Sequence, residues 1–338
     1  MNLAKPRVDD RALWDVVFGV YGYPAVLVAH RLKLFALLAE RPHTLAEVCD
    51  ALALERRPAE TMLAAAASLG FLELHDGRYA NTTLAEDYLL ERSPMYFGSY
   101  WDLIIDNHEV CSYAGIEKAL VTNTPQVFGG EEVFRSLDEQ AALAQGFTRG
   151  MHGISMGPAL AWPQQFDLAC HQVILDVGGG SGAHAIGAVA AWPALRAIVL
   201  DIGPVCEVAS EFITQAGLAD RIETHAADMW EDPFPAADVH FYSNIFHDWP
   251  AEKGRFLAEK SFASLPSGGR IFAHEVLYNE DKTGPFATAG YSMIMMGWAT
   301  GEQYSSRELA TLLTETGFHD IEEKLTFGYY STVTATKP

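Results

Sequence analysis

The stretch SNIFHDWP, residues 243–250, places two ionisable side chains and a large aromatic ring directly after an apolar run. A histidine has an ordinary pKa of about 6.5, so it can take up and release a proton near neutral pH. His247 is therefore a candidate general base, with a capping or core histidine as the alternative. Asp248 either contacts a substrate or caps the helix that we expect from about Pro250, and Trp249 is expected to pack.

A second group of such residues begins with the glycine-rich sequence LDVGGGSG, which follows a buried strand and opens a helix. Glycines let the backbone turn sharply and approach a ligand closely. Asp201 ends the next strand, about 20 residues beyond the loop, where a carboxylate can accept both hydroxyls of a ribose. Asp228 and Met229 end the third strand and offer an acceptor for an exocyclic amine and a soft face for a base. We therefore predict an adenosine site formed by Asp176, Gly178, Gly179, Gly180, Gly182, Asp201, Asp228 and Met229.

The same loop argues against some ligands. It carries no lysine of the GKS or GKT type, so a nucleoside triphosphate is not expected. Asp176 precedes the glycines without a basic residue nearby, so this entrance favours a cation over a pyrophosphate. Ala183 still permits a dinucleotide-type GxGxxA pattern, and a tight structural turn is the alternative that needs no ligand.

Charge and composition narrow the remaining function classes. The 338 residues include 23 basic and 44 acidic side chains, for a formal net charge of −21. Such a surface repels nucleic-acid phosphates and anionic lipid, so we expect neither as a partner. No uninterrupted apolar run approaches the roughly 18 residues of a membrane span, and the first residues lack the layout of a secretory signal. The scattered cysteines predict a cytoplasmic protein, since they show no disulfide or CxxC spacing. They are Cys49, Cys111, Cys170 and Cys206.

The elements that must position these residues begin at about residue 170, where strand-like and helical segments alternate. Consecutive strand–helix units predict a parallel sheet with helices on both faces. A last helix, 305–318, precedes strand-like runs 320–327 and 329–336, which are joined so tightly that they must pair antiparallel. We therefore predict an α/β domain over 166–338, a Rossmann-like, mostly parallel sheet with an antiparallel C-terminal edge.

Residues 1–95 show helices followed by a short hairpin, the pattern of a winged helix. Thr44 with Glu47 three residues later predicts a capping box, and Asp76-Gly77 predicts the hairpin turn. This part of the chain carries 10 basic and 13 acidic residues, and its expected recognition helix offers just two arginines. We therefore predict a dimerisation domain and no DNA binding.

Six motifs occur in the order that is typical of one enzyme family: LDVGGGSG, VLDIGPV, AADMWEDPFP, NIFHDWPAEKG, GGRIFAHEVL and LLTETGFHDI. Over nearly its whole length the sequence resembles class I S-adenosylmethionine (SAM)-dependent O-methyltransferases of the caffeate and acetylserotonin group. The resemblance implies that the glycine loop holds the methionine end of SAM, Asp201 its ribose, and Asp228 and Met229 its adenine. We assign Asn244 to the same site, although relatives often carry a basic residue there. The resemblance also implies a homodimer formed through the N-terminal domain.

By the same resemblance, His247 deprotonates a hydroxyl of a small, aromatic acceptor and Glu275 orients its imidazole. The family's second carboxylate, in a Gly-x-Glu-Arg sequence, is missing, because residues 301–304 are GEQY. Either Glu302 shifts into that place or Gln303 orients a less basic histidine.

The acceptor is expected to bind between the aromatic-rich helices of residues 96–165 and the methionine-rich stretch GYSMIMMGWATG, although core packing would use the same residues. The predicted substrate contacts are Asp248, Phe147, Met151, Met293, Met296 and Trp298.

Two other functions remain open. Gln303 together with His240, His247 and His274 would suit a C-methyltransferase acting on an enolisable 2-oxo acid or an activated aromatic carbon, with a metal holding the enolate. His274 and Glu275 are neighbours on a strand and should face opposite sides, so we expect no metal. The other possibility is a fold relative that binds the cofactor without transferring methyl.

Overall fold

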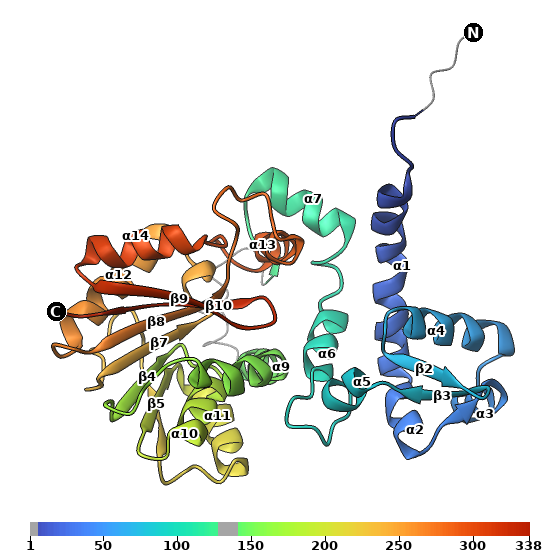
Figure 1. The fold of residues 1–338 in the computed structure, drawn as a ribbon, viewed down its shortest axis with the longest axis horizontal. Helices are drawn as coiled ribbons and strands as arrows, with labels where there is room; N and C mark the ends of the chain where they lie inside the picture. Colours follow the sequence, from blue (N-terminus) through green and yellow to red (C-terminus); the bar gives the residue numbers. More distant parts are fainter. Residues whose placement is uncertain (1–5, 128–140) are drawn as a thin grey trace. The chain divides into compact units, whose positions relative to one another are not determined.

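The computed structural model describes residues 6–127 and 141–338, and it divides into two compact units, Met1–Trp101 and Asp102–Pro338 (Figure 1). Each unit has its own hydrophobic core. The predicted first domain, 1–95, lies within the first unit. The predicted helical region, 96–165, spans the boundary, and its residues 128–140 lie outside the described part of the chain.

The first unit has the predicted order of helices followed by a hairpin. Asp76 and Gly77 turn the hairpin with φ angles of 50° and 76°, the left-handed values of a tight two-residue turn. A short strand that the sequence did not reveal joins this hairpin, giving a sheet in the order β1-β3-β2. The elements are α1 (Arg11–Arg31), α2 (Leu34–Glu40), β1 (His43–Thr44), α3 (Leu45–Leu52), α4 (Arg56–Ser68), β2 (Leu72–His75), β3 (Arg78–Asn81) and α5 (Thr83–Tyr88).

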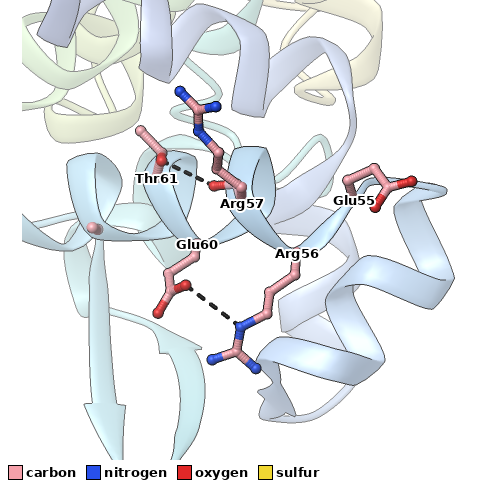
Figure 2. A pocket seen from close by; sticks show the side chains of 6 residues that line it. Glu55, Arg56, Arg57, Glu60 and Thr61 are labelled. Atoms are coloured by element: carbon pink, nitrogen blue, oxygen red, sulfur yellow. Dashed lines mark hydrogen bonds and ion pairs between the residues drawn. The ribbon is translucent and has the colours of Figure 1, made fainter.

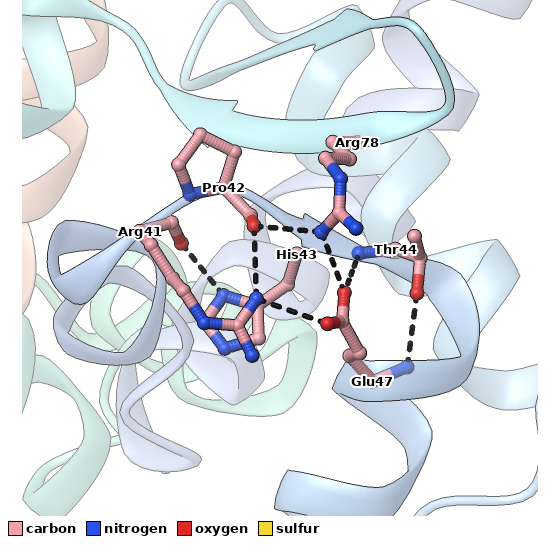
Figure 3. Close-up of polar contacts among 6 residues, drawn as sticks. All are labelled: Arg41, Pro42, His43, Thr44, Glu47 and Arg78. Carbon is pink, nitrogen blue, oxygen red and sulfur yellow. Dashed lines mark hydrogen bonds and ion pairs between the residues drawn. The ribbon is translucent and has the colours of Figure 1, made fainter.

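The start of α3 is fixed by the predicted capping box (Figure 3). The Glu47 N–H donates to Thr44 Oγ1 (3.3 Å), and the Thr44 N–H donates to Glu47 Oε2 (2.7 Å). Arg41 and Arg78 donate to the same carboxylate at 3.0 and 2.9 Å, which ties strand β3 to the helix. Hydrogen bonds from Thr44, and then from Arg41, lower the pKa of Glu47 to about 2. The cluster therefore has a structural role.

Helix α1 exposes an unusual amount of apolar surface. Five of its apolar side chains are 59–76% exposed: Leu13, Val16, Phe18, Val20 and Tyr21. By length and composition alone the helix could cross a membrane, and 11% of its most apolar window is buried. The sequence predicts helices here, but no uninterrupted apolar run marks this one, because Asp15 and two glycines interrupt the apolar residues without making the helix polar. Length and composition do not separate a membrane span from a face that another protein covers.

The second unit contains a seven-stranded sheet in the order β6-β5-β4-β7-β8-β10-β9. The first five strands in this order are parallel, and β10 pairs antiparallel with both β8 and β9, which forms the predicted antiparallel edge. Its strands are β4 (Val173–Val177), β5 (Arg196–Asp201), β6 (Ile222–Ala226), β7 (Val239–Ser243), β8 (Arg270–Val276), β9 (His319–Phe327) and β10 (Tyr330–Thr336). Its helices are α6 (Gly98–Asp106, which crosses the unit boundary), α7 (Tyr113–Thr122), α9 (Ala141–Ala161), η2 (Trp162–Gln164), α10 (Ala183–Ala191), α11 (Gly203–Gln215), η3 (Phe246–Asp248), α12 (Ala251–Ser264), α13 (Phe286–Trp298) and α14 (Ser306–Thr316).

Helices cover both faces of this sheet, with α9, α10 and α11 on one side and α12 and α14 on the other (Figure 1). The central strands β4, β7 and β8 are buried along almost their whole length because helices cover both faces of the sheet. Buried with them are the polar residues Asp176, His240, His274 and Glu275. Gly187 of α10 lies so close to the carbonyl of Ala159 that no Cβ fits between the two helices. This packing holds α9 firmly beside the glycine loop at the start of α10.

Candidate active site

Parallel strands bring the predicted site residues to one edge of the sheet. The carboxyl ends of β4, β5, β7 and β8 meet there, where ligands of such sheets bind. After β7 the chain turns through the 3₁₀ helix η3, which presents His247 and Asp248. Glu275 lies one residue before the end of β8.

His247 is held between two carboxylates. Its Nδ1 lies 2.7 Å from Glu275 Oε2, and its Nε2 lies 3.2 Å from Asp248 Oδ1. The other Glu275 oxygen accepts the backbone N–H groups of Ile245 and Phe246 at 3.2 and 3.1 Å. The carboxylate fixed in this way lies at ion-pair distance from Nδ1, so its negative charge favours a proton on that atom. The Nε2 atom is then the one that can exchange a proton.

The electrostatics of this arrangement make His247 a strong base. Burial alone would lower its pKa, but attraction to Glu275 and then Asp248 outweighs burial and raises the pKa to about 10. Burial raises the pKa of Asp248, and the charge of His247 opposes that shift. The pKa of His247 therefore comes close to that of a phenol, about 10.

Asp248 does not cap α12. The N-cap residue of that helix is Pro250, and the Asp248 carboxylate is instead engaged with His247. The alternative prediction, that Asp248 caps the helix, is therefore wrong. Its carboxylate pairs with His247 and, within the described ranges, accepts no hydrogen bond from the first turn of α12.

Gln303, and not Glu302, reaches the imidazole. The Gln303 side chain is fully buried, and its Nε2 lies 3.1 Å from His247 Nδ1. Within the described residues its Oε1 has no hydrogen-bond partner, so turning the amide over would present an acceptor to the Nδ1 proton that Glu275 also binds. Glu302 has a side chain that is 75% exposed and lies 3.8 Å from Lys282 Nζ.

The glycine loop has the backbone that the sequence predicted. Gly178, Gly180 and Gly182 have φ angles of 64°, 55° and 73°, which favour glycine. Among the described residues no atom lies within 4 Å of a Cβ built on Gly180, so this glycine borders open space. Its N–H donates to Asp201 Oδ2 (2.9 Å), which connects the loop to the end of β5.

Two buried acids lie beside this loop. Burial raises the pKa of Asp176 to about 7, although the Ala185 N–H opposes the shift, and burial raises the pKa of Asp201 to about 6. Gly179 packs directly on the Asp176 side chain, where a Cβ would lie 2.8 Å from its Cγ. Buried carboxyl groups with raised pKa values gain most from a nearby positive charge, so this site suits a cation.

The remaining predicted cofactor residues lie around the same edge. The exposed Asp228 accepts the Trp230 N–H on Oδ1 (2.8 Å) in its own loop, and Met229 Sδ would lie 3.9 Å from a Cβ on Gly178. Asn244 has a left-handed φ of 56°, and its Nδ2 donates to the hydroxyl of Tyr330 (3.2 Å).

The predicted acceptor residues divide into two groups. Phe147 of α9 and Trp298 of α13 pack 5.9 Å apart, between ring centroids, in a small apolar cluster. Met151 and Met296 are partly buried, whereas Met293 is 38% exposed. The two aromatic residues are therefore in contact with each other, whereas Met293 lies on the exposed side of α13.

Tyr291 was not among the predicted site residues, yet the centroid of its ring lies 5.2 Å from that of the His247 ring. It lies two helical turns before Trp298 on α13, so the same face of the helix carries both rings. That spacing was the available signal. Tyr330 was also missed, because nothing in the sequence places a residue of the last strand beside Asn244.

The three histidines proposed for a metal do not converge. His240 bonds Ser261 on the α12 side of the sheet, and His274 bonds Ser243 and packs against His184. In the described ranges no three His, Cys, Asp or Glu side chains form a metal-binding group. The metal-assisted alternative therefore lacks a ligand set here.

A separate hollow lies over α4 in the first unit, lined by Glu55, Arg56, Arg57, Glu60, Thr61 and Ala64 (Figure 2). Arg56 lies 3.7 Å from Glu60, so the acids balance the arginines. The hollow lies on α4, the helix that a DNA-binding winged helix would insert into a groove, and it is lined by two arginines and two glutamates.

Family models match both units of the chain. An O-methyltransferase domain matches residues 116–319, and an O-methyltransferase dimerisation domain matches residues 14–91. The 3-hydroxy-5-methyl-1-naphthoate 3-O-methyltransferase of Streptomyces sahachiroi is 33% identical over 310 residues, which are 91% of this chain and 89% of that protein. The chain belongs to the O-methyltransferase family.

Two further relatives are informative. The crystal structure of human N-acetylserotonin methyltransferase in complex with SAM superposes with a TM-score of 0.86 at 26% identity, covering 100% of this chain and 99% of that one. An L-tyrosine C(3)-methyltransferase of Streptomyces lavendulae is 28% identical, covering 93% of this chain and 88% of that protein. This O-methyltransferase uses SAM, as its family and its SAM-bound structural relatives do.

The residues of the site fit that cofactor. SAM supplies an electrophilic methyl group on a sulfonium, and it also carries an ammonium group. The buried carboxyls of Asp176 and Asp201 suit these positive charges. The open space beside Gly180 leaves room for the ligand to approach the backbone of the loop. Asp201 would also accept ribose hydroxyls, and Met229 would face the base.

Proposed function

We propose that this O-methyltransferase methylates a hydroxyl of a small aromatic acceptor, with His247 as the general base. The observation that supports this most strongly is the position of the His247 imidazole between the carboxylates of Glu275 and Asp248. Glu275 is fixed by two backbone N–H groups and binds Nδ1, which leaves Nε2 to receive the acceptor proton.

The strength of the base fits the acceptor class. With its pKa raised to about 10, His247 takes a proton from a phenol of similar pKa at little free-energy cost. Glu275 stabilises the imidazolium that results, Gln303 supports the same edge of the ring, and Asp248 lies beside Nε2 where it can bind the hydroxyl. Tyr291, Phe147 and Trp298 offer apolar walls for an aromatic ring.

The test is transfer of labelled methyl from SAM to a panel of phenols. The panel contains 3-hydroxy-5-methyl-1-naphthoate and N-acetylserotonin, because the relatives' names give these acceptors, together with simple naphthols. Label on a phenolic oxygen, lost in His247→Asn, would support the proposal. Parental rates in His247→Asn would remove the base assignment.

A second candidate is transfer to carbon, which the tyrosine C(3)-methyltransferase among the relatives favours. A phenolate made by His247 is also an activated aromatic carbon nucleophile at its ring positions. Product analysis separates the two outcomes, because label on carbon survives ether cleavage and label on oxygen does not.

We also propose a homodimer formed through the first unit. The match to a dimerisation domain and the exposed apolar side chains of α1 support a second copy as the partner that covers this helix. The scattered cysteines support a cytoplasmic location. The net charge of −21 argues against nucleic acid and anionic membranes as partners.

A further inference from the structure

Asn244 adopts a backbone conformation that is uncommon for a residue other than glycine. It lies between the end of β7 and the turn that carries His247, with a φ angle of 56°. Asparagine tolerates this region better than most residues, but the surrounding structure must still hold it there. Whatever holds Asn244 therefore also fixes the start of the catalytic turn.

Two contacts hold it. The Asn244 N–H donates to the carbonyl of His274 (3.2 Å), and its side-chain Nδ2 donates to the Tyr330 hydroxyl (3.2 Å). The Tyr330 ring stacks on the His274 imidazole with centroids 4.8 Å apart and planes 3° apart. His274 is in turn held by a hydrogen bond between its Nδ1 and Ser243 Oγ (2.9 Å). Tyr330 is thus a rigid support that β10 contributes.

The two residues after β7 turn to different neighbours. Ile245 packs toward the glycine loop, where its Cδ1 would lie 2.5 Å from a Cβ on Gly178. The Asn244 side chain instead meets Tyr330, whose hydroxyl also bonds Tyr291. The ring of Tyr291 contacts His247. Asn244 therefore faces the side of His247 that we assign to the acceptor.

One atom of Asn244 is left without a partner. Its Oδ1 is buried and has no hydrogen bond within the described part of the chain. A buried carbonyl oxygen that lacks a donor is costly, and such atoms in native structures call for an explanation. A hydrogen-bond donor on a bound molecule supplies one.

We propose that Tyr330 is a positioning residue that holds Asn244 so that its Oδ1 accepts a hydrogen bond from a second donor group on the acceptor, beside the hydroxyl that is methylated. The proposal rests on the proposed function and narrows its substrate class to aromatic molecules with two donors, such as diols. It also places Asn244 with the acceptor instead of the cofactor.

The test measures binding, so that it does not depend on turnover. Dissociation constants for 2-naphthol and for three dihydroxynaphthalene isomers are measured on the full-length protein saturated with S-adenosylhomocysteine. We expect the parent to bind at least one diol about tenfold more tightly than 2-naphthol, and Tyr330→Phe to lose this preference, since one hydrogen bond contributes on this scale. Tyr329→Phe is the matched control, because that neighbouring ring is 64% exposed and should leave the preference unchanged.

Two further variants guard the result. Asn244→Gly keeps the left-handed backbone without strain and removes the amide, so it should lose the preference even if Tyr330→Phe folds poorly. In the double variant the loss should not increase, because both changes remove the same contact. The proposal would be overturned if the parent showed no preference for a diol, or if either single variant kept the preference of the parent. It would also be overturned if the variants lost only affinity for S-adenosylhomocysteine. Absence of methyl transfer by the parent would instead count against the proposed function.

Discussion

Gly301 and His247 are in backbone contact: no Cβ fits between Gly301 and the His247 carbonyl, and the Gly301 N–H donates to the carbonyl of Asp248 at 3.1 Å. This contact brings Gln303, two residues later, to the imidazole. Gly301→Ala should therefore push the segment away, lower the melting temperature by several degrees and lower kcat at least tenfold.

The matched control for this substitution is Gly290→Ala. Gly290 lies inside α13, and no described atom is within 4 Å of a Cβ built there. Alanine should be neutral or stabilising by up to about 1 kcal/mol at such a helical position. Equal effects of the two substitutions in thermal unfolding and steady-state kinetics would contradict the packing argument.

The pH dependence of activity follows from His247. Its raised pKa of about 10 means that at pH 7 about one molecule in a thousand holds the neutral base. We expect kcat/KM to rise about tenfold per pH unit from pH 7 toward 10, and Asp248→Asn to move the profile to lower pH by removing one attracting charge. A profile that is flat above pH 7 would argue against this base.

The same shift affects stability with the opposite trend. Because the folded pKa lies above the unfolded value of about 6.5, the stabilisation is complete below pH 6.5 and is lost as the pH rises through 10. The melting temperature of the parent should fall over this range. The fall should be smaller in His247→Asn, which has no proton to lose there.

Gln303 controls the charge around the imidazole. Gln303→Glu would add a second carboxylate beside Nδ1, raise the pKa of His247 further and move the pH–rate profile to higher pH. Glu302→Gln is the control, because Glu302 is exposed and paired with Lys282, and its kinetics should stay within twofold of the parent. A shift in the control and none in Gln303→Glu would show that Glu302 supplies the second carboxylate.

Asp176 should make the protein less stable without its cofactor and improve cofactor binding. Its pKa rises on folding, so ionisation costs stability as the pH rises from about 4 to 7. Asp176→Asn should raise the melting temperature of the ligand-free protein by a few degrees at pH 8 and weaken SAM binding tenfold or more. The difference in melting temperature should be smaller at pH 5 and disappear near pH 3, where Asp176 is protonated in both the folded and the unfolded chain.

The exposed side of α1 should carry the dimer. Phe18→Asp together with Val20→Asp places two charges on side chains that are 59% and 67% exposed, so the monomer should tolerate them. We expect light scattering after size exclusion to change from a dimer to a monomer. Val121→Asp, at an 80% exposed position of α7, should leave the dimer intact. A parent that is monomeric and floats with lipid vesicles would point to a membrane role for α1.

The sequence predicted the fold and the strand-end residues because both depend on local patterns. Buried runs of five to seven residues alternate with helices, and parallel strands necessarily bring Asp176, Asp201 and the residues after β7 to one edge. His247 and Glu275 follow from the same logic, since β7 and β8 are neighbours.

Contacts that depend on tertiary packing could not be predicted in this way. Asp248 matched the pattern of a helix cap, but its carboxylate pairs with His247. Met293 shares a sequence stretch with Trp298, yet the rotation of α13 turns it to the surface. Gln303 was distinguished from Glu302 by the close approach at Gly301, which no local pattern reveals.

The position of β10 has a consequence for how the enzyme is made. This strand follows every other strand of the sheet in the chain, yet it pairs with β8 and places Ser331 opposite Glu275 and Tyr330 beside Asn244. On the ribosome, the nascent chain can assemble the SAM-binding strands well before this strand has emerged. The strands of the methyl-donor site can therefore pair before β10 completes the acceptor side of the sheet.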